Sequence, residues 1–195
     1  PPSAVTALVA TQELEREPGA TIIHNLITSL AVSEIVEEKG GTPIRTRVGH
    51  SFIKARMAET GAIFGGEHSA HYYFRDFWRA DTGMLAAMHV LRVLGMDDRP
   101  LSQITEEYSR YVASGEINSE VTDAAGRTAA VREAFAGREG AVIDELDGLT
   151  VTLQGGSWFN LRASNTEPLL RLNVEAADES GMVALRDEVL AIVRA

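Results

Sequence analysis

The sequence predicts an α/β fold in two domains: a layered α/β domain over residues 1–115 and a smaller α+β domain over residues 116–195. Two observations lead to this prediction. In the first half, helical and strand-like segments alternate with short links, a pattern typical of layers built around a largely parallel sheet. In the second half, three strand-like segments follow one another between two helices, which favours an α+β arrangement.

The first half begins with a helix that Ser3 is expected to cap and that Pro18-Gly19 ends. Two further helices stop at glycines, one at Gly40-Gly41 and one, which starts near Ser51, at Gly61. Strand-like segments alternate with these helices and cover residues 21–27, 43–48 and 62–64.

A fourth helix is predicted to start at Asp81 or Thr82 and to end at Gly95. Its apolar face is predicted from residues that recur at helical spacing, namely Met84, Ala87, Met88 and Leu91. Residues 96–122 are expected to connect the two domains through a short helix that Ser114-Gly115 stops.

The second half is predicted to contain helices that start at Asp123 and at Asp178 or Ser180. The strand-like segments between them are residues 149–153, 158–161 and 169–175. The last segment alternates most clearly, because its apolar residues fall on one face and its polar residues on the other. The apolar set is Leu170, Leu172 and Val174, and the polar set is Arg171, Asn173 and Glu175.

The composition excludes several classes of function. The 195 residues include no cysteine, so there is no disulfide framework, thiolate metal site or cysteine nucleophile. The formal charge of −10 argues against a nucleic-acid-binding or anionic-membrane surface. No run approaches the ~18 apolar residues of a membrane span. Residues 116–195 carry seven basic and 14 acidic residues, and therefore most of the negative balance.

The first polar loop, residues 65–71, follows a predicted buried strand. Its two glycines allow a tight turn. In an extended loop, Glu67, Ser69 and His71 would share one side and offer a carboxylate, a hydroxyl and an imidazole. Such a set suits a polyol such as a sugar. The alternative interpretation is a polar hairpin turn without a ligand.

The same loop also allows a metal interpretation. His68 and His71, with Glu67 and Asp76 nearby, could supply imidazole and carboxylate ligands to zinc. The spacing H-x-x-H in a loop is much less specific than H-E-x-x-H on a helix. We therefore predict no metal site, and keep a hydrolytic zinc centre as an alternative.

A second polar loop, residues 162–168, lies between two predicted strands. Arg162 supplies a forked cationic donor, and the next polar residues add side-chain donors: Ser164, Asn165 and Thr166. Loop amides can also line an anion-binding nest. The segment therefore predicts a phosphate site, with a simple turn as the alternative because Ser-Asn-Thr is also turn chemistry.

A third candidate is His50, at a junction between strand and helix, where an imidazole could face an anion or move a proton. His24 and His89 are interpreted as structural. The sequence contains no G-x-x-x-x-G-K-[ST], G-x-G-x-x-G or G-x-S-x-G pattern.

Taken together, these segments resemble the α-D-phosphohexomutase superfamily, in its phosphomannomutase/phosphoglucomutase branch. The motifs that carry the resemblance are residues 48–51 (VGHS), 65–71 (GGEHSAH), 81–83 (DTG) and 162–168 (RASNTEP). Residues 61–94 most resemble members from actinobacteria. The resemblance implies a third, α/β domain with a mixed sheet for sugar recognition and a fourth, TATA-binding-protein-like domain for phosphate binding.

The resemblance also implies a reaction, in which hexose 6-phosphate and hexose 1-phosphate interconvert through a phosphoserine enzyme and a bisphosphorylated sugar. Glu67 and Ser69 would bind sugar hydroxyls, and His50 and His71 would act near the reacting end. Four residues would hold the phosphate that is not transferred: Arg162, Ser164, Asn165 and Thr166. Arg171 fits the family pattern, but we interpret it as structural.

The family's phosphoserine loop and acidic Mg²⁺ loop do not occur in this sequence. We therefore expect a C-terminal part of a cytoplasmic mutase, cut before its third domain at Pro1 and inactive alone. Its partners would be a phosphosugar and the missing N-terminal domains, with Mg²⁺ held by one of those domains and hexose 1,6-bisphosphate as activator. The alternative is a stand-alone, non-catalytic phosphosugar-binding module.

This sequence departs from the family pattern at three positions. Ile27 stands where many relatives carry a basic residue, so a cationic contact to the ligand is in doubt. His68 and Ala70 replace the commoner Met and Gly, which leaves the preference between mannose and glucose phosphates open.

Overall fold

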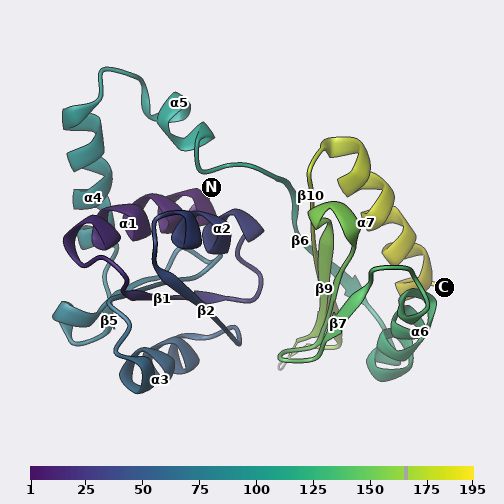
Figure 1. Ribbon diagram of the computed structural model, residues 1–195. Coiled ribbons are helices and arrows are strands. Elements are labelled where there is room, and N and C mark those ends of the chain that lie inside the picture. Colours follow the sequence, from purple (N-terminus) through teal and green to yellow (C-terminus); the bar gives the residue numbers. More distant parts are fainter. Residues whose placement is uncertain (165–166) are drawn as a thin grey trace. The chain divides into compact units, whose positions relative to one another are not determined.

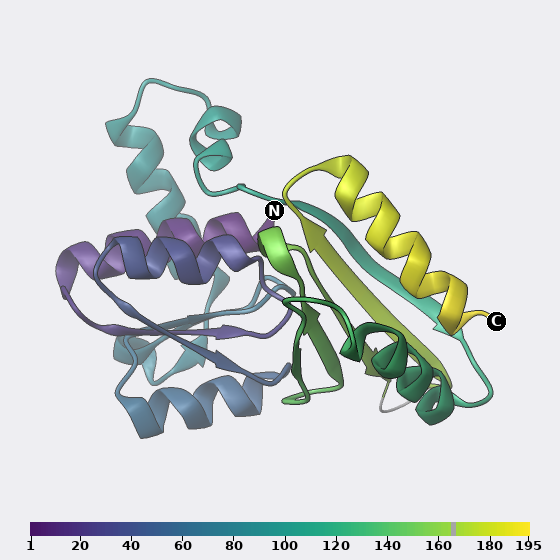
Figure 2. The same cartoon turned by 45° about the vertical axis from the view of Figure 1, so that its right-hand side comes forward.

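The computed structural model describes residues 1–164 and 167–195. The chain forms two compact units, Pro1–Arg110 and Tyr111–Ala195, each with its own sheet and apolar core (Figures 1 and 2). The division precedes β6 (Val112–Glu120) because this strand pairs along its length with β10 (Leu169–Ala176) in the second unit. The predicted boundary at 115/116 falls inside β6.

The first unit is a three-layer α/β structure with a mixed sheet, which confirms the predicted fold class. Its strands have the order β2-β1-β3-β4-β5; β1 is parallel to β2 and β3, whereas β4 and β5 continue antiparallel. Helices α1 and α2 cover one face of this sheet and α3 covers the other (Figure 1). The elements are α1 (Pro2–Arg16), β1 (Thr21–Asn25), α2 (Leu30–Glu38), β2 (Thr42–Thr46), α3 (His50–Thr60), β3 (Phe64–Gly66), β4 (Tyr72–Phe74), η1 (Arg75–Phe77), β5 (Ala80–Asp81), α4 (Gly83–Met96) and α5 (Leu101–Glu106).

Strand β1 shows how one sheet serves two cores. Because successive strand residues point to opposite faces, Ile22 and Ile23 face different layers. Ile22 packs in the cluster that contains Leu8 of α1, and Ile23 packs with Ile53 and Met57 of α3. All five side chains are fully buried. The carboxyl ends of β1 and β3 are thereby fixed side by side.

Helix α4 buries the face opposite to the predicted one, so that prediction is wrong. Met84, Met88 and Leu91 are exposed by 74 %, 57 % and 59 %. The face that packs on the core is formed by Leu85, Ala86, Val90, Val93 and Leu94. The helix is apolar around most of its circumference, so helical spacing fits two faces and only packing selects one.

The start of α1 also differs from the prediction. The helix begins at Pro2 with Pro1 as N-cap, and Pro2 suits this place because the first turn leaves its backbone N–H groups unpaired. Ser3 is buried within the first turn, where its Oγ accepts a hydrogen bond from the Ser29 backbone N at 3.1 Å. Ser3 therefore joins α1 to the start of α2 instead of capping its own helix.

The second unit is a two-layer α+β structure, again of the predicted class. Its sheet has the order β6-β10-β9-β8-β7 with every neighbouring pair antiparallel, and α6 and α7 pack on one face (Figure 2). Besides β6 and β10, the elements are α6 (Ala124–Ala136), β7 (Val142–Asp144), β8 (Leu149–Thr152), η2 (Gln154–Gly156), β9 (Trp158–Ala163) and α7 (Glu179–Val193). Asp123 and Asp178 are the N-caps of the two helices, as predicted.

Strand β6 was not predicted, because Ser114-Gly115 reads as a stop. In the structure this dipeptide lies inside the strand, where Gly115 has φ +69° and the register against β10 shifts. Such a bulge needs a left-handed residue, which glycine adopts without strain. The Ser114 Oγ accepts a hydrogen bond from the Val174 backbone N at 3.0 Å, which keeps the bulge attached to β10.

Candidate functional site

Glu67 lies where the parallel strands β1, β2 and β3 end, the edge at which ligands bind in such sheets. Its carboxylate is buried and accepts three hydrogen bonds: from Gly49 N at 3.1 Å, Asn25 Nδ2 at 3.3 Å and Tyr73 Oη at 2.6 Å. Burial and the bond to Glu67 raise the pKa of Tyr73, so its hydroxyl remains a donor. Glu67 thus fixes the loop that leads to His50.

The loop after Glu67 is a closed turn, not the extended segment predicted. Glu67 N donates to His71 O at 3.0 Å, and Ala70 N donates to Glu67 O at 3.1 Å. Ser69 and His71 are exposed, whereas Glu67 is buried, so the three side chains do not share one open side. Ala70 has φ +65°, a conformation that costs a non-glycine residue about 1–2 kcal/mol.

His50 and His71 line one pocket of about 280 Å³, so the structure brings these two predicted residues together. Its lining residues are His50, Lys54, His71, Tyr73, Ala80 and Asp81. Asp81 orients one imidazole, because its Oδ2 lies 2.6 Å from His71 Nδ1 while its Oδ1 accepts from Tyr72 N at 2.9 Å. A carboxylate that holds one ring nitrogen leaves the other to exchange a proton.

Asp81 lines this pocket, although the sequence suggested no role for it in the candidate site beyond its place in the DTG motif. Its position suggested a helix cap, but the N-cap of α4 is Thr82, whose Oγ1 accepts from Leu85 N at 3.4 Å. Asp81 instead ends β5, which pairs with β4 so that Asp81 lies opposite Tyr73. Because β4 and β5 are only three and two residues long, no clear alternation marked them in the sequence.

The second unit places two arginines opposite each other on its sheet. Arg162 of β9 and Arg171 of β10 are register partners. Arg171 Nη2 donates to Ser164 Oγ at 3.3 Å and Arg171 Nη1 to Glu116 Oε1 at 3.1 Å. The other oxygen of Glu116 lies 3.8 Å from Arg162 Nη2. These contacts gather two guanidinium groups, one hydroxyl and one carboxylate on one face.

Among the residues that the structure describes, both guanidinium groups keep an unused donor. Nε of Arg162 and Nε of Arg171 are buried and have no hydrogen-bond partner within residues 1–164 and 167–195. Two forked cations with spare donors are suited to an oxyanion. The predicted ligands Asn165 and Thr166 lie outside the described residues.

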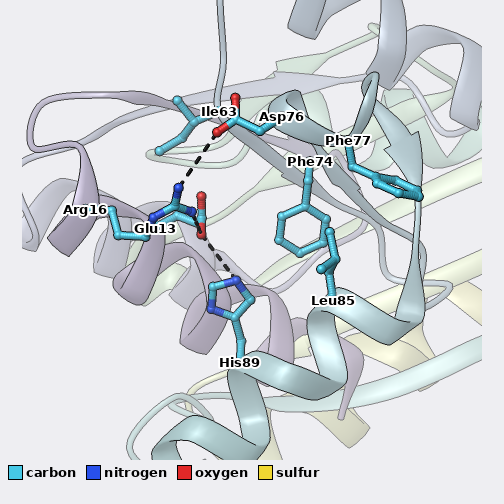
Figure 3. Close-up of a pocket in the computed structure, with 8 residues that line it drawn as sticks. All are labelled: Glu13, Arg16, Ile63, Phe74, Asp76, Phe77, Leu85 and His89. Carbon is cyan, nitrogen blue, oxygen red and sulfur yellow. Dashed lines mark hydrogen bonds and ion pairs between the residues drawn. The ribbon is translucent and has the colours of Figure 1, made fainter.

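Another pocket of about 300 Å³ lies beside α1 and α4 (Figure 3). It contains Asp76 of the zinc alternative but none of the residues predicted to bind sugar or phosphate. Within it, Glu13 Oε1 lies 2.6 Å from Arg16 Nη1 and 3.2 Å from His89 Nε2. The His89 ring stacks on Phe74. Burial alone would raise the pKa of Glu13, but hydrogen bonds from His89 and Arg16 outweigh it, and the pKa is lowered. The cluster ties α1 to α4, consistent with a structural His89.

Two further findings concern metals and membranes. Among the described residues, no group of three or more His, Cys, Asp or Glu side chains is placed to hold a metal ion. In the zinc alternative His71 would be a ligand, and its Nδ1 is engaged by Asp81. In the same part of the chain, no helix combines the length and apolar character needed to cross a bilayer.

The fold and motifs agree with one family of enzymes. Residues 1–111 match the model described as phosphoglucomutase/phosphomannomutase, alpha/beta/alpha domain III, and residues 116–192 match the model of the C-terminal domain. The chain therefore belongs to the phosphoglucomutase/phosphomannomutase family, and the resemblance drawn from its loop motifs is confirmed.

Two of the similar proteins carry the more specific name phosphomannomutase. A phosphomannomutase of Methanocaldococcus jannaschii is 40 % identical over 185 residues, which are 95 % of this chain and 40 % of the relative. A phosphomannomutase of Escherichia coli K12 is 39 % identical over 188 residues, 95 % of this chain and 41 % of the relative. A solved family protein from Burkholderia thailandensis superposes with a TM-score of 0.83 at 30 % identity, over 99 % of this chain and 41 % of that one. The chain thus spans about two fifths of the length of these relatives.

Proposed function

We propose that this chain is the sugar- and phosphate-binding part of a mutase that interconverts hexose 6-phosphate and hexose 1-phosphate. The arginine pair carries the proposal, since Arg162 and Arg171 face each other and their buried Nε donors find no hydrogen-bond partner among residues 1–164 and 167–195. Two guanidinium groups beside the Ser164 hydroxyl suit the doubly charged phosphate of a sugar phosphate. Relatives named phosphomannomutase support this choice of ligand.

In this proposal the second unit holds the phosphate that is not transferred. Arg162 and Ser164 keep the roles predicted from the sequence, with Asn165 and Thr166 as further ligands. Arg171, interpreted as structural from the sequence, joins them because its guanidinium contacts Ser164.

The first unit would bind the sugar and serve the reacting end. Ser69 is exposed in the turn and can meet a sugar hydroxyl, and Glu67 retains acceptor capacity on Oε1, which takes one hydrogen bond. His71 would hold or release a proton at Nε2, because Asp81 engages Nδ1. His50 would contact the ligand from the same pocket.

The transfer itself would need groups that this chain's described residues do not offer. A phosphoserine would donate its phosphoryl group to one sugar oxygen and recover the other phosphate from the bisphosphorylated intermediate. The described residues do not fit a Mg²⁺ site, so we assign the metal no step here. We propose that the further domains of the full protein supply the serine and the metal, in the cytoplasm, with a hexose 1,6-bisphosphate as activator.

A titration of the purified chain with mannose 1-phosphate, glucose 1-phosphate and unphosphorylated mannose tests the proposal. Both phosphates should bind and mannose should not. Arg162→Ala should weaken phosphate binding by about 1.5–3 kcal/mol, because it removes charge-assisted hydrogen bonds.

Arg132→Ala is the matched control, since Arg132 lies on α6 and pairs with Glu145 at 3.3 Å. It should bind as the wild type does. An unchanged affinity in Arg162→Ala would remove that residue from the site.

The chain alone, with Mg²⁺ and glucose 1,6-bisphosphate, should show no mutase activity, and measurable turnover would contradict the division of roles.

A further inference from the structure

The arginine pair poses an electrostatic problem within the second unit. Arg162 and Arg171 are directly opposite in an antiparallel pair, and like charges at such positions repel. Their side chains are 15 % and 29 % exposed, so water screens the repulsion only partly. Without a third group, the two guanidinium groups would be expected to move apart.

Glu116 is the group that bridges them. It lies on β6, next to β10, and its backbone is paired with Asn173, so the side chain reaches Arg171 diagonally. Oε1 accepts from Arg171 at 3.1 Å and Oε2 lies 3.8 Å from Arg162. Glu167 Oε2 also lies 3.8 Å from Arg171 Nη2, but its side chain is 58 % exposed, so water weakens this ion pair.

We propose that Glu116 is a positioning residue of the phosphate site: its carboxylate holds Arg162 and Arg171 side by side, so that both can grip one phosphate. The inference rests on the proposed function and adds a residue to it. In this role Glu116 would act through the two arginines and not through contact with the ligand. Glu116 and the two arginines together carry one net positive charge, which still attracts an anion. The further carboxylate, Glu167, is 58 % exposed, so water screens its charge.

A positioning role and simple charge repulsion predict opposite changes in phosphate affinity when Glu116 is removed. If Glu116 acted only as a nearby negative charge, its removal would strengthen the binding of an anion. If it positions the guanidinium groups, its removal weakens binding, because the two arginines separate. The sign of the change in affinity therefore decides between the two.

The experiment is a titration of the full chain with mannose 1-phosphate, comparing wild type, Glu116→Gln and Glu120→Gln. Glu120 lies on the same strand four residues later and, among the described residues, makes no ion pair with either arginine. Glu116→Gln should lower the affinity by about tenfold or more. Glu120→Gln removes the same charge and should leave the affinity equal or higher.

A second readout follows the arginines directly. In ¹⁵N-labelled protein, the Nε–H signals of Arg162 and Arg171 should shift together when phosphate binds to the wild type, and Glu116→Gln should lose this joint response. Melting temperatures identify any variant that has merely lost its fold. Equal or tighter binding by a folded Glu116→Gln would overturn the inference alone. No binding by the wild type would overturn the proposed function, and this inference with it.

Discussion

The two units of this protein differ in the basic side chains that their candidate sites use. All five histidines lie in the first unit, whereas the second contains none. The candidate site of the second unit depends instead on the guanidinium groups of Arg162 and Arg171. The difference suggests a division of labour: groups that can move protons are gathered in one unit, and a fixed cationic clamp in the other.

Net charge does not explain where the clamp lies. Residues 111–195 carry seven basic and 14 acidic residues, against 11 and 14 in residues 1–110. The more acidic unit therefore contains the candidate anion site. In the proposed function, anion binding there would depend on local pairing across β9 and β10 and not on the field of the whole unit.

The largest predicted effect tests whether the two units are stable separately. Phe159 is fully buried in the core of the second unit and packs edge-on against Phe135 at 4.9 Å. Phe159→Ala should destabilise that unit by about 3–5 kcal/mol, because it leaves a cavity in a core that shares no residue with the first. Urea unfolding followed by hydrogen exchange and mass spectrometry would resolve each unit.

The matched variant is Phe64→Ala, which removes a fully buried phenylalanine from the first unit. It should reverse the order in which the two units unfold. If both variants lowered the unfolding midpoint of both units equally, the separate treatment of the two cores would be wrong.

The second prediction concerns acid. Burial lowers the pKa of His24 to about 4, against roughly 6.5 in the unfolded chain. Between these values the unfolded chain binds a proton that the folded first unit does not. Its stability should therefore fall as the pH drops from about 6.5 to 4, by on the order of 3 kcal/mol in total. Urea unfolding at several pH values measures this slope.

His24→Asn is the control, because Asn keeps a polar atom near Thr28 Oγ1, which lies 2.8 Å from His24 Nδ1. The variant should show a flatter dependence on pH over the same range. The second unit, which has no histidine, should not show this slope. An unchanged slope in the variant would mean that another group governs the acid response.

The third prediction tests the structural role of Glu67 in the first unit. Glu67→Ala leaves Gly49 N, Asn25 Nδ2 and the Tyr73 hydroxyl without their acceptor. The first unit should lose about 2–3 kcal/mol, since buried donors left unpaired are costly. Tyr73→Phe removes only one of the three bonds and should lose about 1 kcal/mol. Thermal unfolding measures both, and a melting temperature unaffected by Glu67→Ala would contradict the network.

The smallest prediction uses one substitution at two places. Ala70 has φ +65°, so Ala70→Gly relieves strain and should stabilise the first unit by up to about 1 kcal/mol. Ala58 is exposed inside α3, where the same change should destabilise it by about 1 kcal/mol. Calorimetry would compare the two signs, and equal losses would show that Ala70 is not strained.

The sequence predicted what depends on local chemistry and failed where packing or pairing decides. End signals such as Asp123, Asp178 and Gly61 located helix ends, because caps act over a few residues. The buried face of α4 was wrong, since an all-round apolar helix does not specify its own orientation. Strand β6 was missed because Ser114-Gly115 is a bulge only in the presence of β10.

The same limit applies to the candidate site. Arg162 could be predicted as a candidate ligand from its loop. Arg171 and Glu116 become candidates because the strand register places them beside Arg162. The sequence did contain a signal for Arg171. When two antiparallel strands are joined by a short loop, residues at equal distances from the centre of the loop lie opposite each other, and Arg162 and Arg171 are such a pair. No comparable signal existed for Glu116, whose strand comes from the other end of the unit.

The pairing of β6 with β10 also affects how the protein is made. During synthesis the first unit can complete its sheet early, but β6 then leaves the ribosome with its partner still to be translated. The partner follows about 50 residues later, a wait of roughly 3–10 s at typical elongation rates. Over that interval residues 112–120 would lack their partner strand, and the charges of Glu116 and Glu120 would oppose their pairing with a neighbouring chain.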